Sequence, residues 1–419
     1  MHELNSSNDL TALLNDMDNA NVVMLGEASH GTHEYYTWRT AISKRLIQEK
    51  GFQFIAVEGD WPDCYKINRY VKGYNDAGDN IREVLKTFDR WPTWMWANWE
   101  VAALADWLRE WNKNKPAGEQ VGFYGLDVYS LWDSMREMVS YLEKEDPKTA
   151  ELAKNAIHCF QPYEEDEQTY ARFSLTRHSC RDEVVRLLKE VRTKAQHHDG
   201  DREAHFNNEQ NALIAVNAER YYRSMMGFDN ESWNIRDGHM METLERLLQF
   251  HGEGTKGIVW EHNTHIGDAR ATNMKRSGTV NIGQLAREAW GKEKVYLTGF
   301  GSYQGSVIAG DSWGAPMHEM PVPAARNGSV EAQLHNENKA NRYLLFHEQE
   351  TRELFQNAIP HRAIGVVYNP DHERISNYVP SEMASRYDAF IYIDRTTALH
   401  PLGIQPHHTE TPETYPFGV

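Results

Sequence analysis

The sequence predicts an α/β fold, with a mostly parallel central sheet flanked by helices and a largely helical insertion. Two observations favour this class. Short apolar runs recur between long segments of helical periodicity, as expected for strands buried on both faces of a parallel sheet. In the middle of the chain this strand signal disappears, and apolar residues repeat only at three- and four-residue spacing. At 419 residues, the chain is long enough to bury a large core that carries such an insertion.

Seven short apolar runs are predicted as strands of the sheet. They are rich in β-branched and aromatic residues and are too short to be buried helices. The segments between them are amphipathic, which predicts helices that cover the sheet. We therefore expect residues 1–128 and 253–419 to form one α/β core. In chain order, the predicted strands are residues 21–25, 53–57, 121–124, 257–260, 294–298, 364–368 and 390–393.

Residues 129–252 contain no predicted strand, and we expect them to form a helical subdomain. In its clearest patterns the apolar residues fall on one face of a helix. The subdomain is inserted between the third and fourth predicted strands, so it is a candidate lid over the ends of the core strands. The three patterns are DEVVRLLKEVRTKAQ from Asp182, NEQNALIAVNAERYYRSMM from Asn208 and DGHMMETLERLLQFHG from Asp237.

The charge balance disfavours nucleic acids and membrane surfaces as partners. The chain has 44 Lys and Arg against 61 Asp and Glu, so its formal net charge of -17 repels phosphate backbones and anionic lipids. No stretch approaches the roughly 18 apolar residues that a membrane span needs, and residues 1–5 lack the features of a signal peptide. We therefore expect a soluble, cytoplasmic protein that binds neither nucleic acid nor membrane. The sequence predicts no particular oligomeric state.

Cysteine usage predicts neither a disulfide framework nor a cysteine-built zinc site. Cys64, Cys159 and Cys180 are an odd number of residues without CxxC spacing. We expect all three to be reduced residues that pack in the interior.

Ionisable side chains follow each of the first four predicted strands. In open α/β sheets, ligands bind at the carboxyl ends of the strands, so these side chains are expected to meet there. They are Glu27 and His30 after the first strand, Glu58 after the second, Asp127 after the third, and His262 and His265 after the fourth. The last two are three residues apart, a spacing that gives a shared direction on one helical turn. Structural alternatives exist, because Glu27 would also neutralise a helix N-terminus and Glu58 would also pair with Arg39.

The segment WPTWMWANW from Trp91 is unusually aromatic. It has two interpretations. Its indole rings could pack in the core between a loop and the next helix. Alternatively, Trp94 and Trp96 could form a hydrophobic wall for a bulky apolar or sugar-bearing ligand, because indole faces bury large areas.

Seven segments together resemble the erythromycin esterase family, and the combination is more specific than any one of them. The resemblance implies that the α/β core is catalytic and that the protein is a metal-independent hydrolase of carboxylic esters. It also implies kinship with proteins labelled as succinoglycan biosynthesis proteins and with enzymes of antibiotic resistance that open macrolide lactones. The segments are GEASHGTHEYYTWR from Gly26, FIAVEGDWPDCYKINRYV from Phe54, GFYGLDVYS from Gly122, VWEHNTHIGD from Val259, TGFGSYQGSV from Thr298, WGAPMHEMPVP from Trp313 and SRYDAFIYIDRTTALHPL from Ser385.

The resemblance also assigns roles to single residues. In that family the histidine of the GExxH segment is taken as the general base, which places the role on His30. Glu27 or Glu58 would then hold its tautomer and stabilise the imidazolium. An oxyanion donor is worth about 3 kcal/mol in other hydrolases. The candidates for that role are Arg39 together with His262 or His265.

The residues themselves favour water as the nucleophile. A serine hydrolase of α/β type would show a G-x-S-x-G segment between a strand and a helix. The chain has this spacing at GDSWG from Gly310, but no helical pattern follows it. Ser29 is adjacent to His30, and neighbouring residues in a loop rarely form the hydrogen bond that a nucleophile and its base require. Histidine, with an ordinary pKa of about 6.5, suits proton removal from water at neutral pH. We expect a small-molecule ester substrate and no cofactor. The predicted substrate contacts are His33, Trp94, Trp96 and Asp127.

Two other functions are compatible with the sequence. The histidines and carboxylates, His33 included, could hold zinc or manganese in a metal-dependent hydrolase. The absence of HExxH and HxxEH segments disfavours this alternative. The chain could also be a non-catalytic relative that binds a small molecule in the same pocket.

Overall fold

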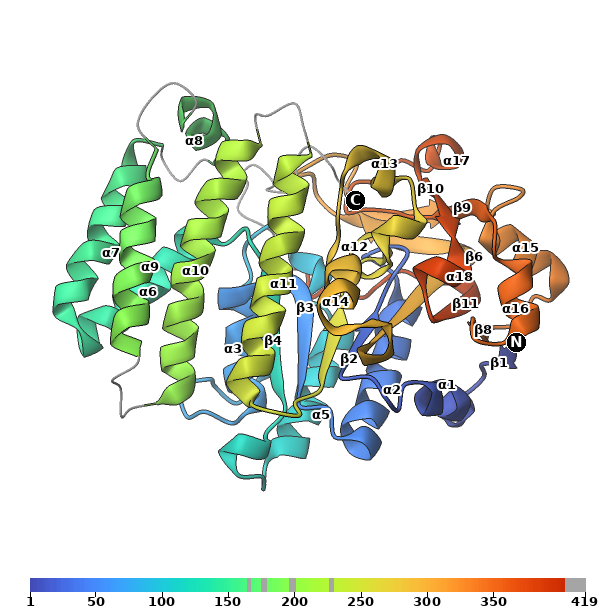
Figure 1. The fold of residues 1–419 in the computed structure, drawn as a ribbon, viewed down its shortest axis with the longest axis horizontal. Coiled ribbons are helices and arrows are strands. Elements are labelled where there is room, and N and C mark those ends of the chain that lie inside the picture. The colour runs from blue at the N-terminus through green and yellow to red at the C-terminus, as the bar shows by residue number, and fades with distance from the viewer. Residues whose placement is uncertain (164–166, 175–178, 196–200, 226–229, 404–419) are drawn as a thin grey trace.

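Six parallel strands form the centre of the sheet in the computed structural model, which describes residues 1–163, 167–174, 179–195, 201–225 and 230–403 (Figure 1). Within those residues, the nine-stranded sheet has the order β1-β8-β11-β6-β2-β5-β3-β4, and β7 pairs with β6. Strands β1, β7 and β8 are antiparallel to their neighbours. The predicted α/β class with a mostly parallel sheet is confirmed. The strands are β1 (His2–Glu3), β2 (Val22–Leu25), β3 (Phe54–Asp60), β4 (Gly122–Asp127), β5 (Gly257–Trp260), β6 (Val295–Ala309), β7 (His318–Val322), β8 (Arg342–Leu345) and β11 (Ala389–Thr396).

Six of the seven predicted strands are present, and the prediction for residues 364–368 is wrong. This apolar run makes only isolated bridges, from Ile364 to Ser29 and from Val367 to Gly310. Its side chains are mostly buried because it packs against the loop after β2 and the end of β6, without joining the sheet. The sequence did not reveal β1, β7 or β8, nor the separate hairpin of β9 (Ala358–Arg362) and β10 (Tyr378–Glu382).

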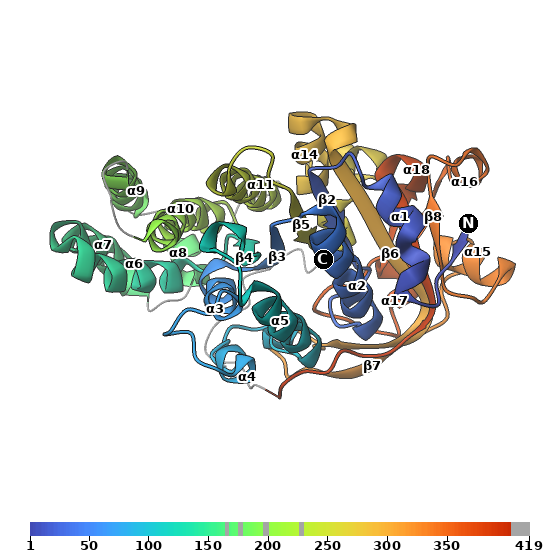
Figure 2. The same ribbon diagram turned by 90° about the horizontal axis from the view of Figure 1, so that it is seen from below.

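Both faces of the sheet are covered, which explains why its strands are continuous apolar runs. Val22 and Met24 point into one hydrophobic core, whereas Val23 and Leu25 point into the other. Figure 2 shows α2 and α5 on one side of the sheet and α11 and α14 on the other. The helices of the core are α1 (Thr11–Asp16), α2 (His33–Lys50), α3 (Trp61–Val71), α4 (Ile81–Leu85), α5 (Trp99–Asn112), α12 (Asn263–Ile266), α13 (Met274–Ser277), α14 (Ile282–Trp290), α15 (Val330–Glu337), α16 (Gln349–Leu354), α17 (Glu373–Ser376) and α18 (Met383–Arg386).

The insertion between β4 and β5 is helical in its described residues, as the sequence predicts. It lies beside the β4 edge of the sheet (Figure 1), where α11 packs against β4 and α14. Its last helix therefore runs along the core, close to the carboxyl ends of the strands. The helices are α6 (Leu131–Glu145), α7 (Pro147–Phe160), α8 (Glu167–Ser174), α9 (Arg181–Ala195), α10 (Arg202–Ser224) and α11 (Glu231–His251).

Two of the three cysteines form a disulfide, so the prediction of three reduced thiols is wrong. Cys159 at the end of α7 is bonded to Cys180, directly before α9. An odd number of cysteines leaves room for one bridge beside one free thiol, and the helical hairpins of the insertion bring these two residues together. Cys64 is free and buried, as predicted.

None of the described helices combines the length and the apolar character that crossing a bilayer requires.

Candidate active site

A buried chain of three charged or polar side chains joins the loop between β2 and α2 to α2 itself. The Nδ1 of His30 lies 2.9 Å from Glu27 Oε1, and Arg39 donates to Glu27 Oε2 at 2.7 Å. All three side chains are at most 3% exposed. The guanidinium of Arg39 also lies over the Tyr36 and Trp260 rings. Glu27 thus connects His30 to Arg39, and the alternative in which Arg39 pairs with Glu58 is wrong.

Close packing fixes the conformation of this loop. A Cβ on Gly31 would collide with the backbone carbonyl of Ile308 in β6. The carbonyl of Gly31 accepts hydrogen bonds from the amides of Ile308 and Leu399. The residue after His30 therefore has to be glycine, and its backbone ties the His30 loop to two distant segments.

A second cluster is centred on Arg236 of α11, which the sequence interpretation missed. Arg236 donates to Glu58 Oε1 at 2.7 Å and to both oxygens of Asp127, at 2.7 and 3.0 Å. It also donates to His265 Nε2 at 3.1 Å, so that His265 keeps its proton on Nδ1, which faces Asp237 at 3.0 Å. Arg236 is 5% exposed and Asp237 is fully buried. Adjacent charged residues in an amphipathic helix look like part of a solvated face, so only the position of α11 reveals their role.

His262 lies between the two clusters. Its ring centroid is 4.9 Å from that of His30, and its backbone amide donates to Glu58 Oε2 at 2.8 Å. The side chain caps α12, because Nδ1 accepts from the Thr264 amide at 3.3 Å and lies 2.8 Å from the Thr264 hydroxyl. An accepting Nδ1 places the ring proton on Nε2. That atom is buried and makes no hydrogen bond of ordinary geometry with a described residue.

The environment separates the proton affinities of these groups. Burial lowers the pKa of His30, but the charge of Glu58 and the hydrogen bond to Glu27 outweigh burial and raise it overall. Burial, together with the positive field of His30, lowers the pKa of His262 well below its ordinary value. Burial opposes ionisation of Glu58, yet the Arg236 guanidinium and the His262 amide hold its pKa well below its usual range. His262 is therefore a neutral donor beside a more basic His30.

Glu261 is a further buried acid at this edge of the sheet. Neither of its carboxylate oxygens has a hydrogen-bond partner among the described residues. Burial, reinforced by the negative charge of Glu58, raises its pKa well above the ordinary value. A carboxyl group in this setting is held in its neutral form.

A pocket with an aromatic wall reaches the second cluster. Glu58, Asp127 and Arg236 are polar parts of its lining. Trp96 also lines it and donates its indole N–H to the Glu58 carbonyl at 3.0 Å. Trp94 does not line this pocket and is 1% exposed, so the structure places it in the core. The other lining residues are Gly59, Asp60, Asp63, Phe88, Arg90, Trp91, Pro92, Thr93, Met95, Tyr129 and Val366.

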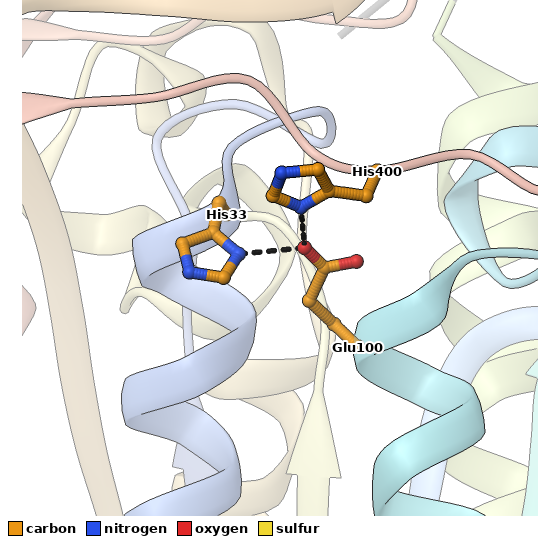
Figure 3. A group of neighbouring side chains, drawn as sticks. All are labelled: His33, Glu100 and His400. Atoms are coloured by element: carbon orange, nitrogen blue, oxygen red, sulfur yellow. Dashed lines mark hydrogen bonds and ion pairs between the residues drawn. The ribbon is translucent and has the colours of Figure 1, made fainter.

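His33 lies apart from both clusters. At the start of α2 it faces Glu100 of α5 and His400, which follows β11 (Figure 3). It is not among the residues that line the pocket. Its predicted contact with substrate stays a prediction.

The predicted catalytic residues are not arranged as ligands of one metal ion. The Nδ1 of His30 is hydrogen-bonded to Glu27. In His265, Nδ1 is hydrogen-bonded to Asp237 and Nε2 to Arg236, so neither nitrogen is free to bind a metal. Burial lowers the pKa of the Arg236 guanidinium, but Asp127 and Tyr129 outweigh burial and raise it well above its ordinary value. Arg236 therefore places a fixed positive charge beside Glu58. A cation at Glu58 would have to overcome this repulsion.

Known proteins resemble this chain over most of its length. The family model of erythromycin esterase matches residues 47–396, which include Glu58, His262 and His265. A putative hydrolase of Bacillus subtilis, YbfO, is 22% identical, with 94% of this chain and 87% of that protein covered. Erythromycin esterase type II of Escherichia coli is 23% identical, with coverages of 82% and 85%.

The fold is shared with solved structures. A Bacillus cereus protein superposes with a TM-score of 0.77 at 21% identity and covers 96% of this chain and 94% of its own. A mutant of the erythromycin esterase EreC in its open conformation has a TM-score of 0.68 at 15% identity, with coverages of 93% and 94%. The match of the family model over most of the sequence decides the classification: the chain belongs to the erythromycin esterase family and is a hydrolase of that family.

Proposed function

We propose that this hydrolase cleaves carboxylic esters by activating water with His30. The observation that carries the proposal is the hydrogen bond between His30 Nδ1 and Glu27, itself held by Arg39. It fixes the proton on Nδ1 and leaves Nε2 free to accept a proton from water. The negative charges of Glu27 and Glu58 then stabilise the imidazolium that forms.

His262 is the oxyanion donor in this proposal. Its Nε2 carries the ring proton, lies beside His30 and makes no hydrogen bond of ordinary geometry with a described residue; the Ala28 backbone is its one weak partner. A donor without a strong partner in a buried site is available to the charge that develops on the ester oxygen. Arg39 and His265, the other candidates, have other tasks in this arrangement: Arg39 holds Glu27, and His265 is held between Asp237 and Arg236.

In this proposal, the substrate enters through the pocket at Glu58 and Arg236. The walls formed by Phe88, Trp91 and Trp96 favour an ester with a bulky apolar part. Macrolide lactones are therefore one candidate class, for which the activity would confer antibiotic resistance, and simple acyl esters are another. His30 and His262 do not line this pocket, so the walls have to move for a carbonyl to reach them. We further propose that the reaction needs no metal or other cofactor and takes place in the cytoplasm, without nucleic-acid or membrane partners. In that compartment the Cys159–Cys180 bridge would be an exception to the usual reduced state of cysteines.

The test compares His30→Asn, His262→Ala and a control, His318→Asn, on a panel of macrolides and acyl esters. Removal of the base should reduce kcat by about 10²–10⁴-fold. Loss of the oxyanion donor should reduce it by about 10²–10³-fold. The control changes a histidine that is roughly half exposed, on β7, and should retain full activity. Unchanged turnover in His30→Asn would refute the general base, and turnover abolished by EDTA and restored by added metal would refute the metal-free mechanism. Absence of turnover on every ester, with measurable binding, would favour a binding protein.

A further inference from the structure

We propose that His33, His400 and Glu100 form a binding site for a divalent first-row transition metal, with zinc as the expected ion. One ligand atom from each residue lies within 4.8 Å of the other two. Both Nδ1 atoms are directed at the same oxygen, Glu100 Oε1, each at 2.6 Å (Figure 3). This trio shares no residue with the clusters around His30 and Arg236, and none of its members acts as base or oxyanion donor in the proposed hydrolysis.

The backbone holds the three side chains in place from three distant segments. His33 is the first residue of α2, and Glu100 is the second residue of α5. The carbonyl of His400 accepts from the Trp99 amide at 3.0 Å, and the His33 amide donates to the carbonyl of Thr397 at 2.9 Å. Only side-chain rotations are therefore needed to adjust the ligand atoms around an ion.

The donor set favours zinc and its neighbours over calcium or magnesium. Imidazole nitrogens suit zinc, copper, iron and nickel, whereas magnesium and calcium prefer oxygen ligands throughout. Two histidines and one carboxylate are a common zinc set, and water completes the tetrahedron. Bonds of about 2.0 Å place the ligands of a tetrahedral zinc about 3.3 Å apart. The Nδ1–Oε1 distances of 2.6 Å must therefore open by less than 1 Å.

Charge and accessibility both suit a cation. The Glu100 side chain is 5% exposed, and its Oε2 has no hydrogen-bond partner among the described residues, so the carboxylate has an unused oxygen. Glu34 adds a second negative charge close to His33. The His400 side chain is 61% exposed, which gives an ion a path from solvent. A bound ion would fasten the segment after β11 to the N-terminal ends of α2 and α5.

The test titrates the full-length protein, freed of metal by EDTA and dialysis, with Zn²⁺ alone in a calorimeter. We expect one equivalent of Zn²⁺ to bind. Substitution of a residue that only supports a metal ligand weakens metal affinity about 10–100-fold. Loss of a ligand itself should weaken the affinity for Zn²⁺ at least as much, and the variants that test this are His33→Ala, Glu100→Gln and His400→Ala. His347→Ala is the matched control, because this histidine is 58% exposed and also has a carboxylate neighbour, Asp16. It should bind Zn²⁺ as the wild type does.

Thermal melting provides a second measurement that checks folding. Without metal, His400→Ala should melt within about 2 °C of the wild type, because it changes an exposed side chain. Zn²⁺ should raise the melting temperature of the wild type and not that of His400→Ala. The proposal is overturned if the wild type binds no Zn²⁺, or if the three ligand variants bind it unchanged. It is also overturned if Zn²⁺ binding is lost in His30→Asn and kept in His400→Ala, since the ion would then belong to the other cluster.

Discussion

Replacement of Arg236 by methionine should destabilise the protein strongly. The guanidinium makes four hydrogen bonds, of which three are to the carboxylates of Glu58 and Asp127. Both carboxylates are 4% exposed. Without Arg236 each retains a backbone N–H, from His262 and Val128 respectively, and no other lysine or arginine of the described residues pairs with either. Removal of one partner from a buried ion pair costs about 3–5 kcal/mol, and we expect a loss in this range.

A double variant separates lost charge pairing from lost packing. If the uncompensated Asp127 charge causes the loss, Arg236→Met combined with Asp127→Asn should be more stable than Arg236→Met alone. The expected coupling between the two sites is about 0.5–3 kcal/mol, because the residues are in direct contact. Arg276→Met, at an exposed position of α13, should change stability by less than about 0.5 kcal/mol.

Urea unfolding measured by tryptophan fluorescence suits this comparison, since the chain has 13 tryptophans. The reasoning is refuted if Arg236→Met lowers the free energy of unfolding by less than about 1 kcal/mol. It is equally refuted if the Asp127 substitution adds to the loss. In either case the cluster around Arg236 would not depend on charge compensation.

Three further predictions follow from the same structure. The activity should rise with pH as His30 loses its proton, and the midpoint of the pH–rate profile should lie above 6.5 because the pKa of His30 is raised. Glu27→Gln removes one cause of that raised pKa, so its pH–rate profile should move to lower pH. Gly31→Ala should lower the free energy of unfolding by about 1–3 kcal/mol in urea titrations, since the new Cβ meets a backbone carbonyl; an unchanged midpoint would contradict the close packing. Thiol titration of the unreduced, denatured protein should find one free thiol, from Cys64, and three titratable thiols would contradict the bridge. Replacement of both Cys159 and Cys180 by serine should lower the free energy of unfolding by about 3 kcal/mol, because the bridge spans a sequence separation of 21 residues.

The strands that the sequence predicts correctly are those with both faces buried. A continuous apolar run such as VVML at β2 is informative, because each of its side chains lies in one core or the other. The run at residues 364–368 (IGVVY) is also apolar and rich in β-branched residues, but it is buried by loops, and composition does not distinguish these two kinds of burial. Strands at the edge of the sheet, such as β7 (HEMPV), alternate in burial and contain polar residues or proline, so their signal is weak.

The site shows a similar division. Glu27, His30, Glu58 and His262 follow strands of one parallel sheet, and topology alone brings the ends of such strands together. Arg236 comes from the helical insertion, and periodicity cannot tell which side of α11 meets the core. Its neighbour Asp237 faces His265 in the same way. The polar residues of the insertion were therefore beyond prediction from the sequence until the position of α11 was known.

The contacts of Arg236 and Asp237 change the expected role of the insertion. A lid would cover the site and could be removed without exposing unpaired charge. Here α11 supplies the cation that compensates Glu58 and Asp127 and the carboxylate that orients His265. Without α11, Glu58 and Asp127 at the ends of β3 and β4 would lose their guanidinium partner, and His265 would lose Asp237. The core and α11 therefore depend on each other for stability, and the insertion is as much a part of the site as the strands it follows.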